Sequence, residues 1–212
     1  MRGAGAALAL ATMVSGILAG CSSAGEPAPD FLNADVARSY LPLSGTRDIV
    51  LTGHGAGVVI EDGIAVTNAH NANLVDGGET IGASMQYDLM YFHTASGTAE
   101  ATAKPWLAEQ VIAYGQGADG SLRMARGRVT SLDSLANNQQ CPTCGPQHAF
   151  TFEADAGPGF SGGPVVDAAD GKLIGIVFGF VDQKDGSRLI YAYDMARVFG
   201  ELAVIEGRPA GR

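Results

Sequence analysis

Short apolar or alternating runs, separated by Gly, Asn and Asp residues, fill most of the chain from Asp48 onward. Many short strands between regularly placed turn residues predict an all-β barrel or sandwich. The segment Met195 to Ile205 then predicts a C-terminal helix. The predicted strands are Ile49 to Leu51, Gly57 to Ile60, Ile64 to Asn68, Asp88 to His93, Gln110 to Gly115, Ser121 to Thr130, Ala149 to Ala154, Gly163 to Asp167, Leu173 to Phe180 and Arg188 to Tyr193.

The N-terminus has a different pattern, which is typical of an export signal. Arg2 is followed by an apolar stretch, Ala4 to Leu18, and Leu18-Ala19-Gly20-Cys21 resembles a bacterial lipobox. A membrane-spanning helix is the alternative, but the stretch is short and interrupted by glycine. We therefore predict that residues 1–20 are a lipoprotein signal peptide and that the Cys21 thiol is acylated. This places the protein in the bacterial cell envelope, anchored in a membrane and facing the extracytoplasmic side.

The residues after Cys21 predict a connecting segment. Ser22 to Pro29 consists of small residues with two prolines, which is typical of a flexible tether. Phe31 to Leu41 can be drawn as a short helix. We assign residues 21–45 to a lipidated tether with this N-terminal segment, and residues 46–212 to one folded domain.

The charge of the chain excludes one class of partner. The sequence has 22 acidic and 13 basic residues, a net charge of -9, and no basic run. A protein that binds nucleic acid needs a basic surface for the phosphates. We therefore expect no nucleic-acid partner, and the acidity concerns solubility more than function.

A glycine-rich turn, Gly159 to Pro164, places Ser161 where a backbone can present a nucleophile together with N–H donors. The base that such a serine needs stands upstream as His70, and a carboxylate follows it as Asp88. All four histidines precede the serine. In α/β-hydrolases the acid and the histidine follow the nucleophile, so that family is excluded.

In this order the motifs resemble the trypsin-like (chymotrypsin-fold) serine peptidases, and among them the bacterial single-chain HtrA/Deg-like type. The resemblance runs from about Leu51 to about Met195, and no room follows it for a PDZ domain. It implies two six-stranded antiparallel β-barrels with the catalytic groups in the cleft between them, so that residues 46–212 form a trypsin-like serine peptidase domain. The motifs that carry it are Ala65 to His70, Tyr87 to Met90, Val111 to Gly115, Gly127 to Thr130 and Gly159 to Pro164.

The resemblance implies a role for each site residue. Ser161 is the nucleophile, His70 is the base, and Asp88 orients the imidazole. Asp76 is the alternative third member, although Asp76-Gly77-Gly78 looks like a turn. The remaining histidines, His54, His93 and His148, lack a matching context.

The implied oxyanion hole consists of the main-chain N–H groups of Gly159 and Ser161. Phe160 lies between them, where animal trypsin-like enzymes carry an aspartate that pairs with a newly cut N-terminal amine. A phenyl ring cannot make that pair, so this route of activation is excluded.

Substrate specificity is harder to read from the sequence. Asp155 lies where related enzymes that cut after Lys or Arg place the acid of the pocket floor. Alternatively, it is only the polar end of the strand Ala149 to Ala154. Phe178 and Phe180 are expected to line or narrow the same pocket.

Two cysteines, Cys141 and Cys144, fall in the turn-rich segment Asn137 to Gln147. An exported protein favours a disulfide between them. A zinc site with His148 is the alternative, but no further ligand stands nearby to complete a tetrahedral set. We therefore expect neither a metal nor an organic cofactor.

These features together predict an extracytoplasmic serine endopeptidase that hydrolyses protein or peptide substrates through an acyl-enzyme on Ser161. Two alternatives remain. One is a catalytically silent trypsin-fold binding or scaffold lipoprotein, and the other is an esterase that uses the same triad.

Overall fold

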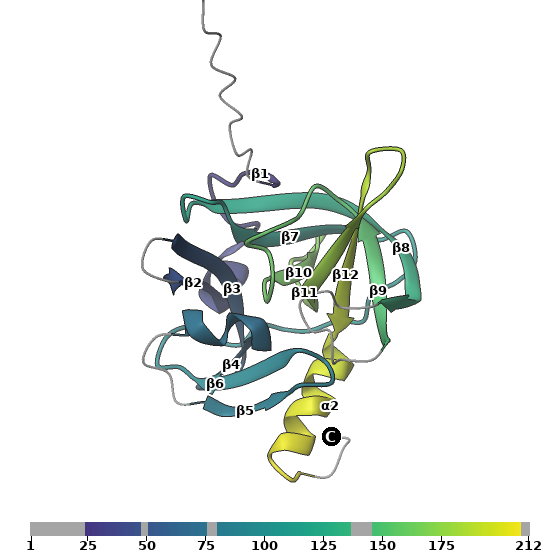
Figure 1. Cartoon of the computed structure of the whole chain (residues 1–212). Helices are drawn as coiled ribbons and strands as arrows, with labels where there is room; N and C mark the ends of the chain where they lie inside the picture. The colour runs from purple at the N-terminus through teal and green to yellow at the C-terminus, as the bar shows by residue number, and fades with distance from the viewer. Residues whose placement is uncertain (1–23, 48–50, 76–79, 137–145, 209–212) are drawn as a thin grey trace, which may run out of the picture.

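The computed structural model describes residues 24–47, 51–75, 80–136 and 146–208. Two antiparallel sheets make up most of it (Figure 1). The all-β prediction is therefore confirmed. The signal segment 1–20 and several residues singled out above lie outside the described ranges: Cys21, Asp76, Cys141 and Cys144.

The first sheet has five described strands in the order β2-β3-β4-β6-β5, one fewer than the six that the resemblance implies. β4 has the predicted bounds. β5 was not predicted because Ile81 is the single large apolar residue in it, and its positions are exposed or half-buried at the edge of the sheet. The strands are β2 Tyr40–Arg47, β3 Leu51–Glu61, β4 Ile64–Asn68, β5 Thr80–Ser84 and β6 Leu89–His93.

The second sheet has seven strands in the order β1-β8-β7-β10-β11-β12-β9. A further pairing joins β8 to β9, so the six strands from β8 to β9 form a ring. Only β1, at the outer edge, lies outside this ring. The strands are β1 Glu26–Pro27, β7 Gln110–Gln116, β8 Leu122–Ala136, β9 Gln147–Glu153, β10 Pro164–Asp167, β11 Leu173–Asp182 and β12 Arg188–Asp194.

The C-terminal helix α2, Met195–Ile205, has the predicted bounds and ties the two sheets together. It leaves the end of β12 and runs beside β5 (Figure 1). The buried hydroxyl of Tyr91 on β6 donates a hydrogen bond to the Val198 carbonyl of the helix at 2.7 Å. A Cβ atom at Gly82 of β5 would lie 2.5 Å from Ile205, so glycine allows the close approach of helix and strand. In the described part of the chain, neither helix is long and apolar enough to cross a membrane.

The N-terminal segment differs from its prediction in two ways. The expected flexible tether is wrong from Ala24 to Ala28, because β1 pairs with β8 and the Ala28 N–H donates to the Leu122 carbonyl at 3.1 Å. The expected helix is shorter, since α1 spans only Ala34–Ser39 and Tyr40 already begins β2. The folded unit therefore starts well before residue 46, because main-chain pairing with distant strands orders residues whose side chains predict no structure.

Candidate active site

Asp88 holds His70 at two points. The imidazole Nδ1 lies 2.6 Å from one carboxylate oxygen, and the main-chain N–H of His70 donates to the other at 2.9 Å. The Asp88 side chain is only 2% exposed, while His70 is 14% exposed at the surface. A carboxylate held in this way fixes both the plane of the ring and the tautomer that carries its proton on Nδ1.

The backbone of Asp88 is strained into the left-handed region, with φ at 50°. Aspartate tolerates this conformation better than most residues do. The carbonyl of Asp88 accepts hydrogen bonds from the Ala69 N–H at 2.8 Å and from the Asn68 amide at 3.1 Å. Hydrogen bonds from Asn68, Ala69 and His70 thus maintain a conformation that costs free energy, a pattern found at functional sites.

The segment that carries His70 also holds the serine turn. His70 and Asn71 lie in a 3₁₀ helix, η1 Ala69–Leu74, directly after β4. The Asn71 amide donates to the Ser161 carbonyl at 3.0 Å, and the Ala56 N–H donates to the same carbonyl at 3.0 Å. Strand β3 and the helix η1 that follows β4 therefore position Ser161, which lies in the turn before β10 of the second sheet. The Ser161 hydroxyl has no hydrogen-bond partner among the described residues.

The glycines of the serine turn are required by close contacts. Gly159 has φ at +91°, and a Cβ atom there would lie 2.1 Å from the Gln116 carbonyl oxygen. Gly162 has φ at +79°, and its Cβ would lie 2.2 Å from the Ala56 carbonyl oxygen. No other residue type fits either position without moving the backbone.

The main-chain donors of this turn fall into two groups. The N–H groups of Phe160, Gly162 and Gly163 each donate to a backbone carbonyl, at 2.8 to 3.0 Å. The N–H groups of Gly159 and Ser161 donate to no acceptor in the described part of the chain. This is the pair that the resemblance implies as the oxyanion hole, which needs donors free to bind a substrate oxygen.

Comparisons with known proteins identify the family and the fold. Residues 92–176 match the family model of the trypsin-like peptidase domain. Residues 92–176 are therefore part of a trypsin-like peptidase domain. The predictions of a trypsin-like serine peptidase, and so of a hydrolase, are thereby confirmed. No curated protein sequence matches the chain significantly.

Solved structures show the same fold at low sequence identity. The active form of the Rv3671c protease from M. tuberculosis is 20% identical with a TM-score of 0.67, over 89% of this chain and 90% of that one. The MamO protease domain from Magnetospirillum magneticum is 17% identical with a TM-score of 0.61, over 79% and 97%. The HtrA-type protease AlgW with a tripeptide is 20% identical with a TM-score of 0.64, over 83% of this chain and 63% of that one.

One residue that supports the site of this trypsin-like domain was not predicted. Gln116, at the end of β7, is 2% exposed, and its main-chain N–H donates to the Gly159 carbonyl at 3.0 Å. Its side-chain amide donates to the carbonyls of Leu43, at 2.8 Å, and of Gly55, both in the first sheet. Gln116 therefore connects the oxyanion turn to the opposite sheet. No sequence signal identifies it, because its partners lie 43 to 73 positions away.

Phe178 and Phe180, which were predicted to line or narrow the substrate pocket, do not form an open pocket in the structure. Phe178 is 1% exposed and stacks on Tyr193 with ring centroids 4.1 Å apart, so it belongs to the core and lines no open pocket. A β-bulge between Val177 and Gly179 interrupts the strand here. Phe180 is half-buried, with the Arg188 guanidinium 4.6 Å above its ring.

Asp155 does not form a buried pocket floor in the trypsin-like domain. Its side chain is 76% exposed and lies 3.6 Å from Arg188 Nη1. Arg188 also contacts Asp182 at 2.7 Å and donates to the Ala156 carbonyl at 2.9 Å. A carboxylate that faces both solvent and an arginine is a poor partner for a basic substrate side chain, so the expected role of Asp155 is not supported.

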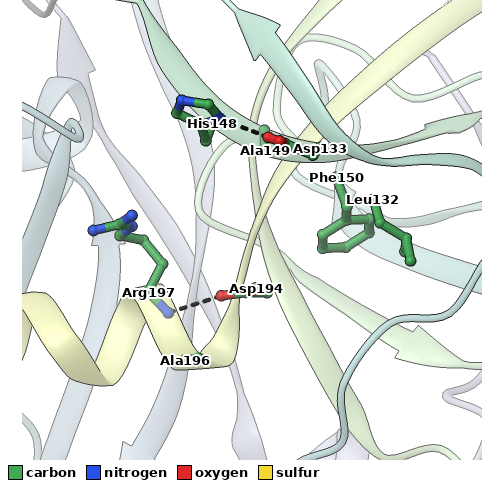
Figure 2. A pocket seen from close by; sticks show the side chains of 8 residues that line it. All are labelled: Leu132, Asp133, His148, Ala149, Phe150, Asp194, Ala196 and Arg197. Carbon is green, nitrogen blue, oxygen red and sulfur yellow. Dashed lines mark hydrogen bonds and ion pairs between the residues drawn. The ribbon is translucent and has the colours of Figure 1, made fainter.

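A separate hollow of about 430 Å³ lies between the β8–β9 hairpin and the start of α2 (Figure 2). None of its lining residues belongs to the predicted triad. His148 lines it and pairs with Asp133 at 2.5 Å, while Asp194 caps α2 by accepting the Arg197 N–H at 2.8 Å. Within the described ranges, no cluster of three or more His, Cys, Asp or Glu side chains could hold a metal ion.

Proposed function

We propose that the chain is a serine endopeptidase in which Ser161, His70 and Asp88 form the catalytic triad. The observation that carries this proposal is the double contact of Asp88 with His70, next to an Asn71 amide that holds the Ser161 carbonyl. A base fixed in one tautomer beside a serine on a turn with unoccupied N–H donors is the arrangement that acyl transfer requires.

The first half of the reaction forms the acyl-enzyme. The Nε2 atom of the neutral His70 ring accepts the proton of the Ser161 hydroxyl while the serine oxygen bonds to the substrate carbonyl carbon. The N–H groups of Gly159 and Ser161 stabilise the negative oxygen that develops. His70 then donates the proton to the amine nitrogen as the carbon–nitrogen bond breaks. Throughout, Asp88 stabilises the positive charge on the ring.

The second half releases the acyl group. Water replaces the departed amine and gives a proton to His70 as it attacks the acyl carbon. The bond to the serine oxygen then breaks, and His70 returns the proton to Ser161. The expected substrate is a peptide or protein, in agreement with the tripeptide in the AlgW structure.

Labelling with a fluorophosphonate probe, followed by mass spectrometry of the adduct, tests this proposal. We expect one adduct, on Ser161, and none in Ser161→Ala or His70→Ala, both of which should remain folded because the two side chains are partly exposed. Labelling that persists in Ser161→Ala contradicts the assignment. A folded parent chain without an adduct indicates a silent scaffold, and turnover of esters without peptides indicates an esterase.

We also propose that the mature chain is a lipoprotein attached through Cys21, on the extracytoplasmic side of a bacterial membrane. The lipobox-like sequence before Cys21 supports this proposal. An oxidising compartment in turn favours a disulfide between Cys141 and Cys144. Mass spectrometry of a digest without reductant tests the disulfide: the peptide that contains both cysteines should be two hydrogens lighter than its reduced form.

A further inference from the structure

The segment Ala24 to Ala28 lies across the start of β8 as a strap, and three types of contact hold it there. β1 pairs with β8 at Glu26 and Pro27 (Figure 1). The Arg123 guanidinium donates to the carbonyls of Ala24, at 3.2 Å, and of Gly25. Glu26 lies 3.3 Å from Arg126 at the surface.

The strap packs directly on the oxyanion turn. Phe160 is fully buried, and its ring fills the space between Gly25 of the strap and Gly115 of β7. A Cβ atom at Gly25 would lie 2.7 Å from Phe160 Cζ, and one at Gly115 would lie 2.6 Å from Phe160 Cγ. The Ala24 methyl group would lie 2.9 Å from a Cβ at Gly157, where the turn begins.

Phe160 has a particular position in this turn. It stands between the two residues whose N–H groups are proposed to bind the substrate oxygen, Gly159 and Ser161. Its N–H donates to the Gly157 carbonyl at 3.0 Å, and its carbonyl accepts from Gly163 at 2.9 Å. A shift of the ring therefore moves the peptide groups on both sides, since the ring and these donors belong to one short turn. Sub-ångström placement of such donors governs catalysis.

We propose that the strap Ala24 to Ala28 is a positioning element of the active site. By covering the Phe160 ring, it keeps the oxyanion turn in its catalytically competent conformation. Without the strap, one face of a large apolar side chain meets water, and the turn can relax to bury the ring elsewhere. This inference rests on the proposed peptidase function. It does not depend on acylation at Cys21.

The first test compares two glycines with similar backbones. Gly25 has φ at +72° and touches Phe160, whereas Gly207 has φ at +66° and has nothing within 4 Å of a Cβ position. Gly25→Ala and Gly207→Ala thus introduce similar backbone strain, but only the first also presses a methyl group on the Phe160 ring and on the Met124 carbonyl of β8, at 2.7 Å from each. We expect kcat on a peptide substrate to fall by about 10- to 100-fold in Gly25→Ala, less than the loss of an oxyanion donor costs. KM should change less than about twofold, because only transition-state binding is lost. Gly207→Ala should keep the parent kcat.

The second test uses the unmodified chain, so it holds even where Gly25→Ala does not fold. A fluorophosphonate adduct on Ser161 places an oxygen in the oxyanion hole and should stabilise the turn. Because coupling is reciprocal, the strap should then be stabilised as well. We expect slower hydrogen exchange in a peptide covering residues 24–28, where the Ala28 N–H bonds to β8.

The outcomes separate the two proposals. A parent chain that gives no adduct overturns the peptidase function. A parent chain that is labelled normally, while a folded Gly25→Ala enzyme keeps the parent kcat, overturns the positioning role alone. If Gly25→Ala does not fold, unchanged exchange of the strap after labelling overturns it.

Discussion

The Asp88 carboxylate contacts both the ring and the main chain of His70, with one oxygen 2.6 Å from Nδ1 and the other 2.9 Å from the main-chain nitrogen. Both oxygens are thus engaged by the same residue. The ring cannot rotate without losing the first contact, and the start of η1 cannot move without losing the second. One buried side chain therefore sets the orientation of the base and the position of the helix that holds the serine turn.

We expect Asp88→Asn to lower kcat by about 10⁴-fold, because an amide that donates to Nδ1 selects the wrong tautomer of His70. The side chain keeps its size, and its oxygen can still accept the His70 main-chain N–H. Steady-state kinetics on a peptide substrate measures the loss, and thermal unfolding shows whether the fold is kept. Asp76→Asn is the matched control. A large loss there, with near-normal activity in Asp88→Asn, would show that the third triad member is misassigned.

We expect Gln116→Met to reduce both stability and activity. Methionine has a similar volume but cannot donate to the Leu43 and Gly55 carbonyls, and an unsatisfied buried polar group costs about 1–3 kcal/mol. The free energy of unfolding, measured with urea, should fall by that order. Because the main chain of Gln116 holds Gly159, kcat should fall as well.

Gln183→Met is the control for this change, since Gln183 lies exposed in the β11–β12 hairpin. It should leave the free energy of unfolding and kcat near the parent values. Equal effects of the two substitutions would contradict a specific role for Gln116.

We expect the free energy of unfolding to decrease as the pH rises from 4.5 to about 7, because Glu100 ionises in this range. Burial, with the charges of Asp35 and Asp170, raises the pKa of Glu100 from 4.5 to about 7, against a hydrogen bond from Ser39. The folded chain therefore binds this proton more tightly than the unfolded chain does. Below pH 4.5 the Glu100 carboxyl group is protonated in both states and does not lower the free energy of unfolding. Between pH 4.5 and 7 the free energy of unfolding falls because the buried carboxylate is less stable than the solvated one, and above pH 7 this loss stays constant.

Urea unfolding of the parent and of Glu100→Gln across this pH range measures the effect. The glutamine variant keeps a neutral side chain at every pH, so its free energy of unfolding should decline less between pH 4.5 and 7. Parallel curves for the two proteins would show that Glu100 does not carry the dependence.

We expect Cys21→Ala to release the protein from the membrane fraction. The thiol is the proposed acyl acceptor, and a lipoprotein anchored by several acyl chains stays membrane-bound, whereas a single chain binds reversibly. Fractionation followed by mass spectrometry of the N-terminal peptide provides the measurement. An unmodified Cys21 in the mature protein, or a retained Met1 to Gly20 segment, would contradict the proposal.

Local patterns in the sequence determined the features that depend on neighbouring residues. The glycine turn around Ser161, the strand before His70 and the C-terminal helix are all visible in short windows. The order of His70, Asp88 and Ser161 along the chain is by itself enough to exclude the α/β-hydrolases, whose acid and histidine follow the nucleophile. The local predictions succeed because backbone freedom and hydrophobic periodicity act over a few residues.

The tertiary structure alone decided the features that depend on distant partners. Ala24 to Ala28 has the composition of a tether, yet main-chain pairing with β8 and packing on Phe160 order it. Phe178 turned out to stack on Tyr193 in the core, and Gln116 to connect the two sheets. In each case the deciding contact joins residues on different strands or segments, and burial and hydrogen bonding between them exist only once these have come together in the fold.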